Sequence, residues 1–238
     1  PDWMGQVGVY RVSHFLFADN DAIHPNDANT LYVEESSYVV IENNTLIHGQ
    51  IQVQIINSHE CRIVNNTLLN ASMDSIELSG NNNTISGNII DNASENAIYV
   101  FGSNYQSDYH ILQNRLVNCG AGIKLWDCKD MLIENNEFRN DSVAVEVIES
   151  RASSTRVTHN NFINNRMNAF LLACPLLLSN LIFFNNYYNR PRILPKPLLG
   201  VFLIPIIGGD IAFGIPIPWF CFDWHPAKQP YDIPGGFQ

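Results

Sequence analysis

Seven rows of the sequence repeat one short pattern, and this repeat limits the chain to very few folds. Each row ends in an asparagine, its anchor, as in "IENN" at Ile41–Asn44 and "IVNN" at Ile63–Asn66. An Ile or Val stands three positions before each anchor, and an apolar or aromatic residue stands two positions after it. The anchors are Asn44, Asn66, Asn88, Asn114, Asn136, Asn160 and Asn185, spaced by 22, 22, 26, 22, 24 and 25 residues.

A period in the low twenties is typical of a solenoid in which each repeat forms one coil. The rows also contain alternating runs, such as "SIELS" at Ser75–Ser79 and "GIKLW" at Gly122–Trp126. Such alternation predicts a strand with one buried face, whereas no row has the 3.6-residue period of a helix. We therefore predict an all-β parallel β-helix of about seven coils of 22–26 residues, with equivalent strands paired in parallel.

The anchor asparagines are expected to form an internal ladder. Asparagine tolerates the left-handed backbone of a sharp turn better than most residues, so each anchor is expected at a turn between strands. Its amide can donate to one neighbouring coil and accept from the other. The predicted role of these seven residues is therefore structural, because the ladder pairs turn backbone that would otherwise be buried without partners.

The ends of the chain differ from the repeat. Residues 1–30 are expected to form an N-terminal cap or an incoming coil, and residues 31–190 the parallel β-helix. Residues 191–238 are rich in apolar residues and proline. Since proline cannot donate to a β-ladder, the stack is expected to stop near Asn189, with the tail folded over its last coil as a C-terminal cap. The apolar segment Leu198–Phe220 contains three prolines, two adjacent glycines and Asp210, which argues against a membrane span.

Composition excludes several classes of function. Charged residues make up 15% of the chain, the formal net charge is −10 and there is no basic cluster, which argues against nucleic acid and anionic membranes as partners. None of the five cysteines belongs to a CxxC pair, so no structural zinc site is predicted. The seven histidines do not share columns in adjacent rows. No metal site and no cofactor are therefore predicted.

The rows "I-x-N-N-x-I-x-N" resemble the right-handed parallel β-helix repeat family, which includes NosD-like periplasmic proteins and carbohydrate-binding and sugar-hydrolase modules. The resemblance runs from about Leu31 to Asn189. The tail, including "IPWFCFDWHPAKQPYDI" at Ile217–Ile233, is similar to the end of secreted archaeal and bacterial β-helix proteins. The resemblance to this family implies a right-handed coil, which agrees with the usual hand of parallel crossovers. It also implies an extracellular or cell-surface location, periplasmic in a Gram-negative host.

Alternation assigns an outward column on the second strand of each coil. Its predicted members are Gln52, Glu77, Tyr99, Lys124, Glu146 and Leu171, with Trp126 and Asp127 at a strand end. Sugar rings stack on tyrosine and tryptophan, and carboxylates accept hydrogen bonds from hydroxyl groups. The predicted carbohydrate-binding residues are therefore Glu77, Tyr99, Lys124, Trp126, Asp127 and Glu146. A solvated sheet face with a cross-strand aromatic ladder is the structural alternative.

The carboxylates of this column do not form a catalytic pair. Glu77 and Glu146 are three coils apart, or ~14 Å at strand spacing, whereas an inverting glycosidase needs about 6.5–9.5 Å. Lys124 beside Glu146 should keep that carboxyl ionised, which is unfavourable for a general acid. No catalytic residue is assigned.

N-glycosylation motifs occur at six asparagines, and most of them belong to the repeat. Asn70, Asn92 and Asn140 share a column expected to lean inward, where glycans would not fit. Asn82, at a junction between rows, is the predicted acceptor if the host glycosylates its proteins.

These observations favour a non-enzymatic extracytoplasmic β-helix protein that binds a polysaccharide or other glycan, or that assembles with copies of itself at a cell surface. The first alternative is a polysaccharide lyase or glycoside hydrolase acting from the outer face. The second, implied by the resemblance to NosD-like proteins, is a copper-handling periplasmic protein.

Overall fold

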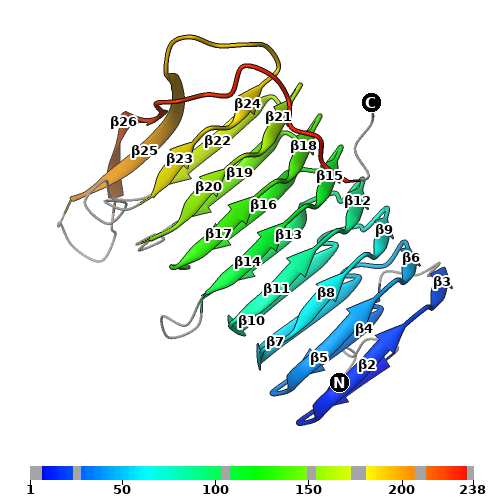
Figure 1. The fold of residues 1–238 in the computed structure, drawn as a ribbon. Coiled ribbons are helices and arrows are strands. Elements are labelled where there is room, and N and C mark those ends of the chain that lie inside the picture. Colours follow the sequence, from blue (N-terminus) through cyan, green and yellow to red (C-terminus); the bar gives the residue numbers. More distant parts are fainter. Residues whose placement is uncertain are drawn as a thin grey trace.

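The computed structural model is a stack of short strands wound into a parallel β-helix, so the predicted all-β solenoid is confirmed (Figure 1). It describes residues 7–23, 28–102, 108–148, 154–172, 181–206 and 213–234, with only the backbone described for 202–206 and 213–215. Within these ranges all regular structure is strand, and none contains a helix long and apolar enough to cross a membrane.

Three walls enclose the core. Each of the eight complete coils contributes one strand to each wall, all in parallel, and the tail adds two more strands to the first wall, the last of them antiparallel. The first wall contains β1 (Val7–Tyr10), β4 (Leu31–Glu34), β7 (Val53–His59), β10 (Ile76–Asn81), β13 (Asn96–Phe101), β16 (Ala121–Trp126), β19 (Val143–Ile148), β22 (Met167–Leu172), β25 (Lys196–Ile206) and β26 (Phe213–Asp223). The second contains β2 (Ser13–Ala18), β5 (Ser37–Glu42), β8 (Arg62–Val64), β11 (Asn83–Ser86), β14 (Tyr109–Leu112), β17 (Met131–Glu134), β20 (Arg156–Thr158) and β23 (Ile182–Phe184). The third contains β3 (Asp21–Ile23), β6 (Thr45–Ile47), β9 (Thr67–Leu69), β12 (Ile89–Asp91), β15 (Arg115–Val117), β18 (Glu137–Arg139), β21 (Asn161–Ile163) and β24 (Tyr187–Tyr188).

The third wall has eight strands, one more coil than the seven rows of the sequence. The additional coil is β1–β3, which pairs in parallel with β4–β6. Residues 7–23 are thus an incoming coil, one of the two expectations for the N-terminal segment. The sequence rows missed this coil because Phe17 stands where the rows from Asn44 to Asn160 have Ile or Val, and Ala22 stands where they have Leu, Ile or Phe.

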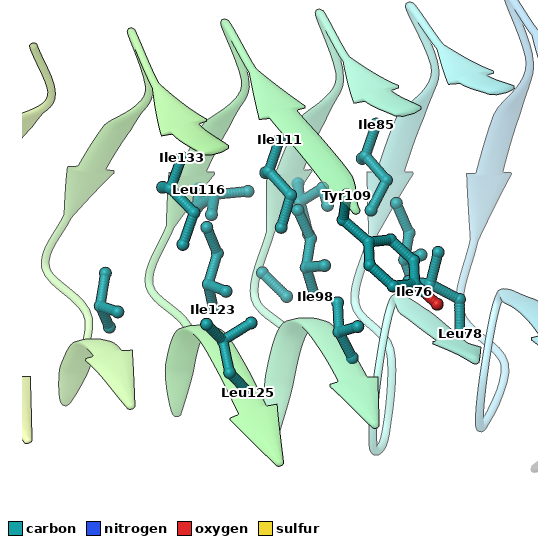
Figure 2. Close-up of a cluster of buried hydrophobic side chains, with 14 of the residues drawn as sticks. Ile76, Leu78, Ile85, Ile98, Tyr109, Ile111, Leu116, Ile123, Leu125 and Ile133 are labelled. Carbon is teal, nitrogen blue, oxygen red and sulfur yellow. The ribbon is translucent and has the colours of Figure 1, made fainter. Parts of the chain in front are cut away.

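The core consists mainly of aliphatic side chains in repeated positions. Isoleucine, leucine and valine point inward from all three walls and stack coil upon coil, as Ile98 and Ile123 of the first wall and Ile111 and Ile133 of the second do in Figure 2. These four residues are fully buried. Each such side chain contributes about 1.5–3 kcal/mol through burial.

An asparagine ladder lies at the turn between the second and third walls. Its members after Asn20 are Asn44, Asn66, Asn88, Asn114, Asn136, Asn160 and Asn186. The Nδ2 of Asn88 donates to Oδ1 of Asn114 at 2.9 Å, and the backbone N–H of Asn88 donates to the same oxygen at 3.0 Å. The second Nδ2 hydrogen of Asn114 goes to the Ile85 carbonyl at 2.9 Å. Each amide therefore connects two coils and satisfies turn backbone, as expected.

Two details of the ladder differ from the prediction. The left-handed residue is not the anchor but the residue before it: Asn43, Asn65 and Asn135, for example, have φ of 55–57°. This explains the "NN" pairs, in which the first asparagine makes the turn and the second enters the ladder. The assignment of Asn185 as the last anchor is wrong, because Asn185 makes the turn (φ 59°) and Asn186 enters the ladder.

The error at Asn185 has a physical reason. The row "LIFFNN" has apolar residues at consecutive positions, so the inward one cannot be identified from alternation. The structure pairs Val157 with Phe183, which is buried, whereas Ile182 is 48% exposed. The anchor three positions after Phe183 is Asn186.

The first wall continues beyond Asn189, contrary to the expected end of the stack. β25 pairs in parallel with β22 through Phe170–Leu172, and β26 then returns antiparallel to β25. Proline does not prevent this pairing because the shared residues of β25, Leu199–Val201, lie between Pro197 and Pro205. The third wall ends earlier, at β24.

The ladder ends at a buried carboxylate from the tail. Asp223, the last residue of β26, accepts hydrogen bonds from the backbone N–H groups of Asn185, Asn186 and His225, from Nδ2 of Asn186 and from the hydroxyl of Tyr188, all at 3.0–3.1 Å. After Asp223 the chain runs back along the ends of the third-wall strands (Figure 1), where Tyr231 exchanges two backbone hydrogen bonds with the Asn161 amide. That the tail protects the last coil as a cap remains a prediction.

A second buried aspartate is less well satisfied. Asp141 is 1% exposed; its Oδ1 accepts the Cys119 N–H at 2.8 Å, but its Oδ2 has no hydrogen-bond partner. Burial, assisted by the negative charge of Asp91, raises the pKa of Asp141 well above its usual range. In the next coil Asn165 occupies the equivalent position, and its Nδ2 donates to the Phe138 carbonyl at 3.0 Å.

Replacing Asn114 by leucine tests the ladder. The substitution removes the acceptor of the Asn88 amide and backbone N–H and the donor to Ile85, so we expect a loss of about 2–4 kcal/mol in the free energy of unfolding. Chemical denaturation measures it. His110→Leu, at an exposed position of β14, is the control and should cost less than about 0.5 kcal/mol. Equal stability of the two variants would show that the ladder contributes nothing.

Replacing Asp141 by asparagine should stabilise the protein. Because the folded-state pKa is raised, the folded form binds the extra proton, and stability falls as pH rises from the unfolded value of about 4. The neutral amide removes this loss and can donate as Asn165 does, so at pH 7 we expect a gain of about 1–3 kcal/mol. The gain should disappear near pH 4. Denaturation curves at both pH values measure it, and a lower stability of Asp141→Asn at pH 7 would contradict the assignment.

The same substitution at Asp223 should have the opposite sign. Asp223→Asn replaces one acceptor oxygen by an NH₂ group that faces the donors of the ladder end, so we expect a loss of about 2–3 kcal/mol at pH 7. Thermal melts of the two asparagine variants side by side provide the measurement. If Asp223→Asn had the same melting temperature as the wild type, the Asp223 carboxylate would not be the group that terminates the ladder.

Candidate functional site

The outer face of the first wall carries a continuous column of side chains, because parallel strands in register stack equivalent residues. Glu77 pairs with Tyr99, Tyr99 with Lys124, and Lys124 with Glu146 on successive coils. Gln54 precedes Glu77 and Phe170 follows Glu146. We call the six residues from Gln54 to Phe170 the outer column; all are partly exposed.

The ends of the predicted column are corrected by this register. Gln52 and Leu171 were expected in it, but both are fully buried, and Gln54 and Phe170 take their places. The segment from the ladder asparagine to the outer column is one residue longer in the coils of Glu77 and Tyr99 than in the coils of Lys124, Glu146 and Phe170. A shift of one residue moves a strand's side chains to the opposite face, which accounts for Leu171 beside Phe170. Gln52 has the same alternation phase as Gln54, but it precedes β7, and its Nε2 donates to the carbonyls of Leu46, His48 and Leu69.

A second outward column runs beside the first and is apolar. Phe101, Trp126 and Ile148 pair on successive coils, and Trp126 is 45% exposed. The rings of Tyr99 and Phe101 lie 5.5 Å apart. Trp126 therefore has the outward orientation that alternation predicted. Asp127 follows it in a left-handed turn (φ 50°) and lies outside both columns.

Lys124 is held between an aromatic ring and a carboxylate. Its Nζ lies 5.6 Å from the centre of the Tyr99 ring and 3.6 Å from Oε2 of Glu146. This arrangement combines a cation–π contact with an ion pair. The expected neighbour relation of Lys124 and Glu146 is thus present.

Glu77 has a different environment. Its Oε2 accepts a hydrogen bond from the neutral amide of Gln54 at 3.3 Å. Burial raises the pKa of Glu77, and the nearby negative charge of Asp74 adds to the rise. Asp74 itself is 3% exposed, with Oδ1 accepting both the N–H and Nδ2 of Asn96. Asp74 is therefore too buried to act on a substrate beside Glu77.

The predicted glycan acceptor lies at an exposed turn. Asn82 has φ 56°, and its Nδ2 donates to Oε1 of Glu60 at 2.6 Å. The expectation that Asn70, Asn92 and Asn140 lean inward is wrong. All three are exposed in left-handed turns, since the residue four positions after each anchor is the corner itself.

Sequence reasoning missed a groove that depends on the tail. It has a volume of about 450 Å³ and lies between the third wall and Pro230–Asp232, with Glu137, Arg139 and Tyr187 among its lining residues. Glu137 accepts a hydrogen bond from Nε of Arg139 at 3.0 Å. No sequence pattern predicts this groove, because Asn161 and Tyr231, which join its two sides, are 70 residues apart in the chain.

Comparison with known protein families shows to which family the chain belongs. A family model described as periplasmic copper-binding protein (NosD) matches residues 6–192. The chain belongs to the NosD family. No curated protein matches it significantly.

Two solved structures resemble this NosD-family chain. The periplasmic alginate epimerase AlgG has a TM-score of 0.54 at 16% sequence identity, over 67% of this chain and 43% of the epimerase. The catalytic domain of a GH87 α-1,3-glucanase has a TM-score of 0.41 at 8% identity, over 87% of this chain and 55% of the glucanase. The chain thus spans less than half the length of the epimerase. The likeness to AlgG shows the fold alone.

The copper named in the family description has no evident centre among the described residues. In the described ranges, no group of three or more His, Cys, Asp or Glu side chains could hold a metal ion. Burial raises the pKa of Cys61 to about 11 and that of Cys128 to about 12, whereas metals bind the thiolate. His14 stacks on Tyr38, and His159 contacts Glu134. Two candidate ligands, His24 and Cys174, lie outside the described residues. The residues that are described do not fit a copper site.

Proposed function

We propose that this chain is a non-enzymatic, extracytoplasmic glycan-binding protein that holds its ligand along the outer face of the first wall. The observation that carries the proposal is the placement of Tyr99 and Trp126 on adjacent strands, flanked in register by Glu77 and Glu146. Aromatic faces and hydroxyl-accepting carboxylates are the two kinds of group that sugar rings need, and here they lie side by side.

The shape of the surface supports a chain-like ligand. Neighbouring strands are ~4.8 Å apart, so the outer column from Gln54 to Phe170 extends over five strand spacings. The polar outer column and the apolar column of Phe101, Trp126 and Ile148 run parallel along the solenoid axis. A glycan lying along this axis would meet hydrogen-bonding groups on one side and ring faces on the other.

The charges favour binding over hydrolysis. Glu77, with its raised pKa, has the property required of a general acid, and this is the one observation that favours an enzyme. Its partner in the column, Glu146, is three strand spacings away, ~14 Å, beyond the about 6.5–9.5 Å used by inverting glycosidases. Glu146 is also paired with Lys124. The column therefore lacks a second carboxyl group at catalytic distance.

The proposed extracytoplasmic location is supported by the descriptions of similar proteins. The matching family is described as periplasmic, and so is the epimerase that shares the fold. Both support an extracytoplasmic location for this chain. Assembly with copies of itself is the competing role.

The decisive experiment is a glycan-array screen followed by calorimetry on Trp126→Ala and Tyr99→Ala. We expect each variant to lose at least about tenfold in affinity for the bound glycan, or 1.4 kcal/mol, while its stability changes by less than about 1 kcal/mol. The control is Tyr38→Ala, which removes a ring that is 48% exposed on β5 of the second wall and should leave affinity unchanged.

Two outcomes would contradict the proposal. One is the absence of any glycan ligand for the wild type, or equal binding by all three variants. The other is release of reducing or unsaturated sugars from a bound polysaccharide, which would make the protein an enzyme.

A further inference from the structure

The outer column places a carboxylate on each side of the Tyr99 ring, but a lysine on only one side. Along the outer column, the ring has Glu77 on the preceding strand, and Lys124 followed by Glu146 on the next strands. On the Lys124 side, a protein ammonium lies between the ring and a carboxylate, 5.6 Å from the ring centre and 3.6 Å from Glu146 Oε2. The wall thus already contains one subsite for an ammonium group.

The Glu77 side has the ring and the carboxylate without a lysine. The hydrogen bond of Glu77 is to the neutral amide of Gln54. Burial raises the pKa of Glu77, and the negative charge of the nearby Asp74 adds to the rise. Burial, and to a smaller extent the negative charges of Glu77 and Asp74, raises the pKa of Tyr99 to about 12. Glu77 and Tyr99, on adjacent strands, therefore form a subsite that combines a carboxylate with an aromatic ring.

The charge of this subsite discriminates between glycan classes. A polymer of uronates would bring its carboxylates against Glu77 and Glu146 on a chain of formal net charge −10. A neutral glycan would leave the charge of Glu77 uncompensated. An ammonium group beside Glu77 and over the ring of Tyr99 would repeat the interactions that Lys124 makes two strands on.

Building on the proposed function, we propose that the ligand is a glycan with protonated amino groups, of the 2-amino-2-deoxy sugar class, and that Glu77 and Tyr99 bind one of its ammonium groups. Trp126 and Phe101 then contact the apolar faces of neighbouring sugar rings.

The test uses three trimers of matched length: glucosamine, N-acetylglucosamine and an alginate-derived uronate. Calorimetry at pH 6 is run on the wild type, Glu77→Gln and Glu42→Gln. Glu42 is the matched control, since it is a partly exposed carboxylate pointing outward on β5 of the second wall. We expect the wild type to prefer the glucosamine trimer by about tenfold or more.

The variants test whether Glu77 causes the preference for the glucosamine trimer. Glu77→Gln should bind both amino-sugar trimers about equally, whereas Glu42→Gln should behave as the wild type. Lys124→Met empties the second ammonium position beside Glu146 and should increase affinity for the glucosamine trimer. Thermal melts establish that each variant is folded, and Tyr99→Leu replaces Glu77→Gln in the comparison if the latter does not fold.

The outcomes separate this inference from the proposed function. If the acetylated trimer bound as tightly as the amine, and Trp126→Ala weakened both, the amine class would be wrong and glycan binding would stand. If Glu42→Gln lost as much affinity as Glu77→Gln, net charge alone would explain the preference, and the inference would fall. If no trimer or longer glycan bound the wild type, both proposals would fail together.

Discussion

The hydrogen bond from one buried asparagine amide to the next is the interaction on which this structure depends. It fixes the distance between coils and also their register, because an amide displaced by one residue along the chain would leave its partner's N–H groups unpaired in the core. The neighbouring strands must then stack with equivalent residues aligned. The isoleucine-rich core and the straight outer columns both follow from this alignment, although neither contains a ladder residue.

That alignment is what gives a chain with few charged residues a defined surface. In most folds, a line of six side chains requires several elements to meet at correct angles. Here one strand position, repeated in successive coils, produces the line from Gln54 to Phe170. Changing one residue in one coil alters one point of the line and leaves the fold unchanged, which suits a wall that presents different groups to successive units of a long ligand.

The sequence predicted what repeats and failed where the repeat is broken. Rows anchored from Asn44 to Asn160 contain an Ile or Val three positions before the anchor and a Leu, Ile or Phe two positions after it, so their coils and ladder could be read from spacing. Asn185 was confused with Asn186 because consecutive apolar residues remove the alternation that distinguishes inside from outside.

Leu171 was misplaced because one residue more or less in the intervening segment reverses a strand's faces, and spacing alone does not show where that residue is accommodated. Gln52 was misplaced because the strand begins only at Val53, so alternation does not govern the side chain before it. The roles of Asp223 and Tyr231 could not be predicted at all. They depend on contacts with Asn186 and Asn161 that join segments 37 and 70 residues apart, and no local pattern encodes such a contact.

The ladder also makes the two ends of the solenoid electrically different. Every amide in it has the same orientation, with its carbonyl toward the preceding coil and its NH₂ group toward the next. Amide dipoles aligned in this way add along the axis, as they do in an α-helix, whereas the strand dipoles of a sheet largely cancel. The positive end is the last coil, where the Asp223 carboxylate lies. The molecule therefore has a polarity along its length that is independent of its surface charges.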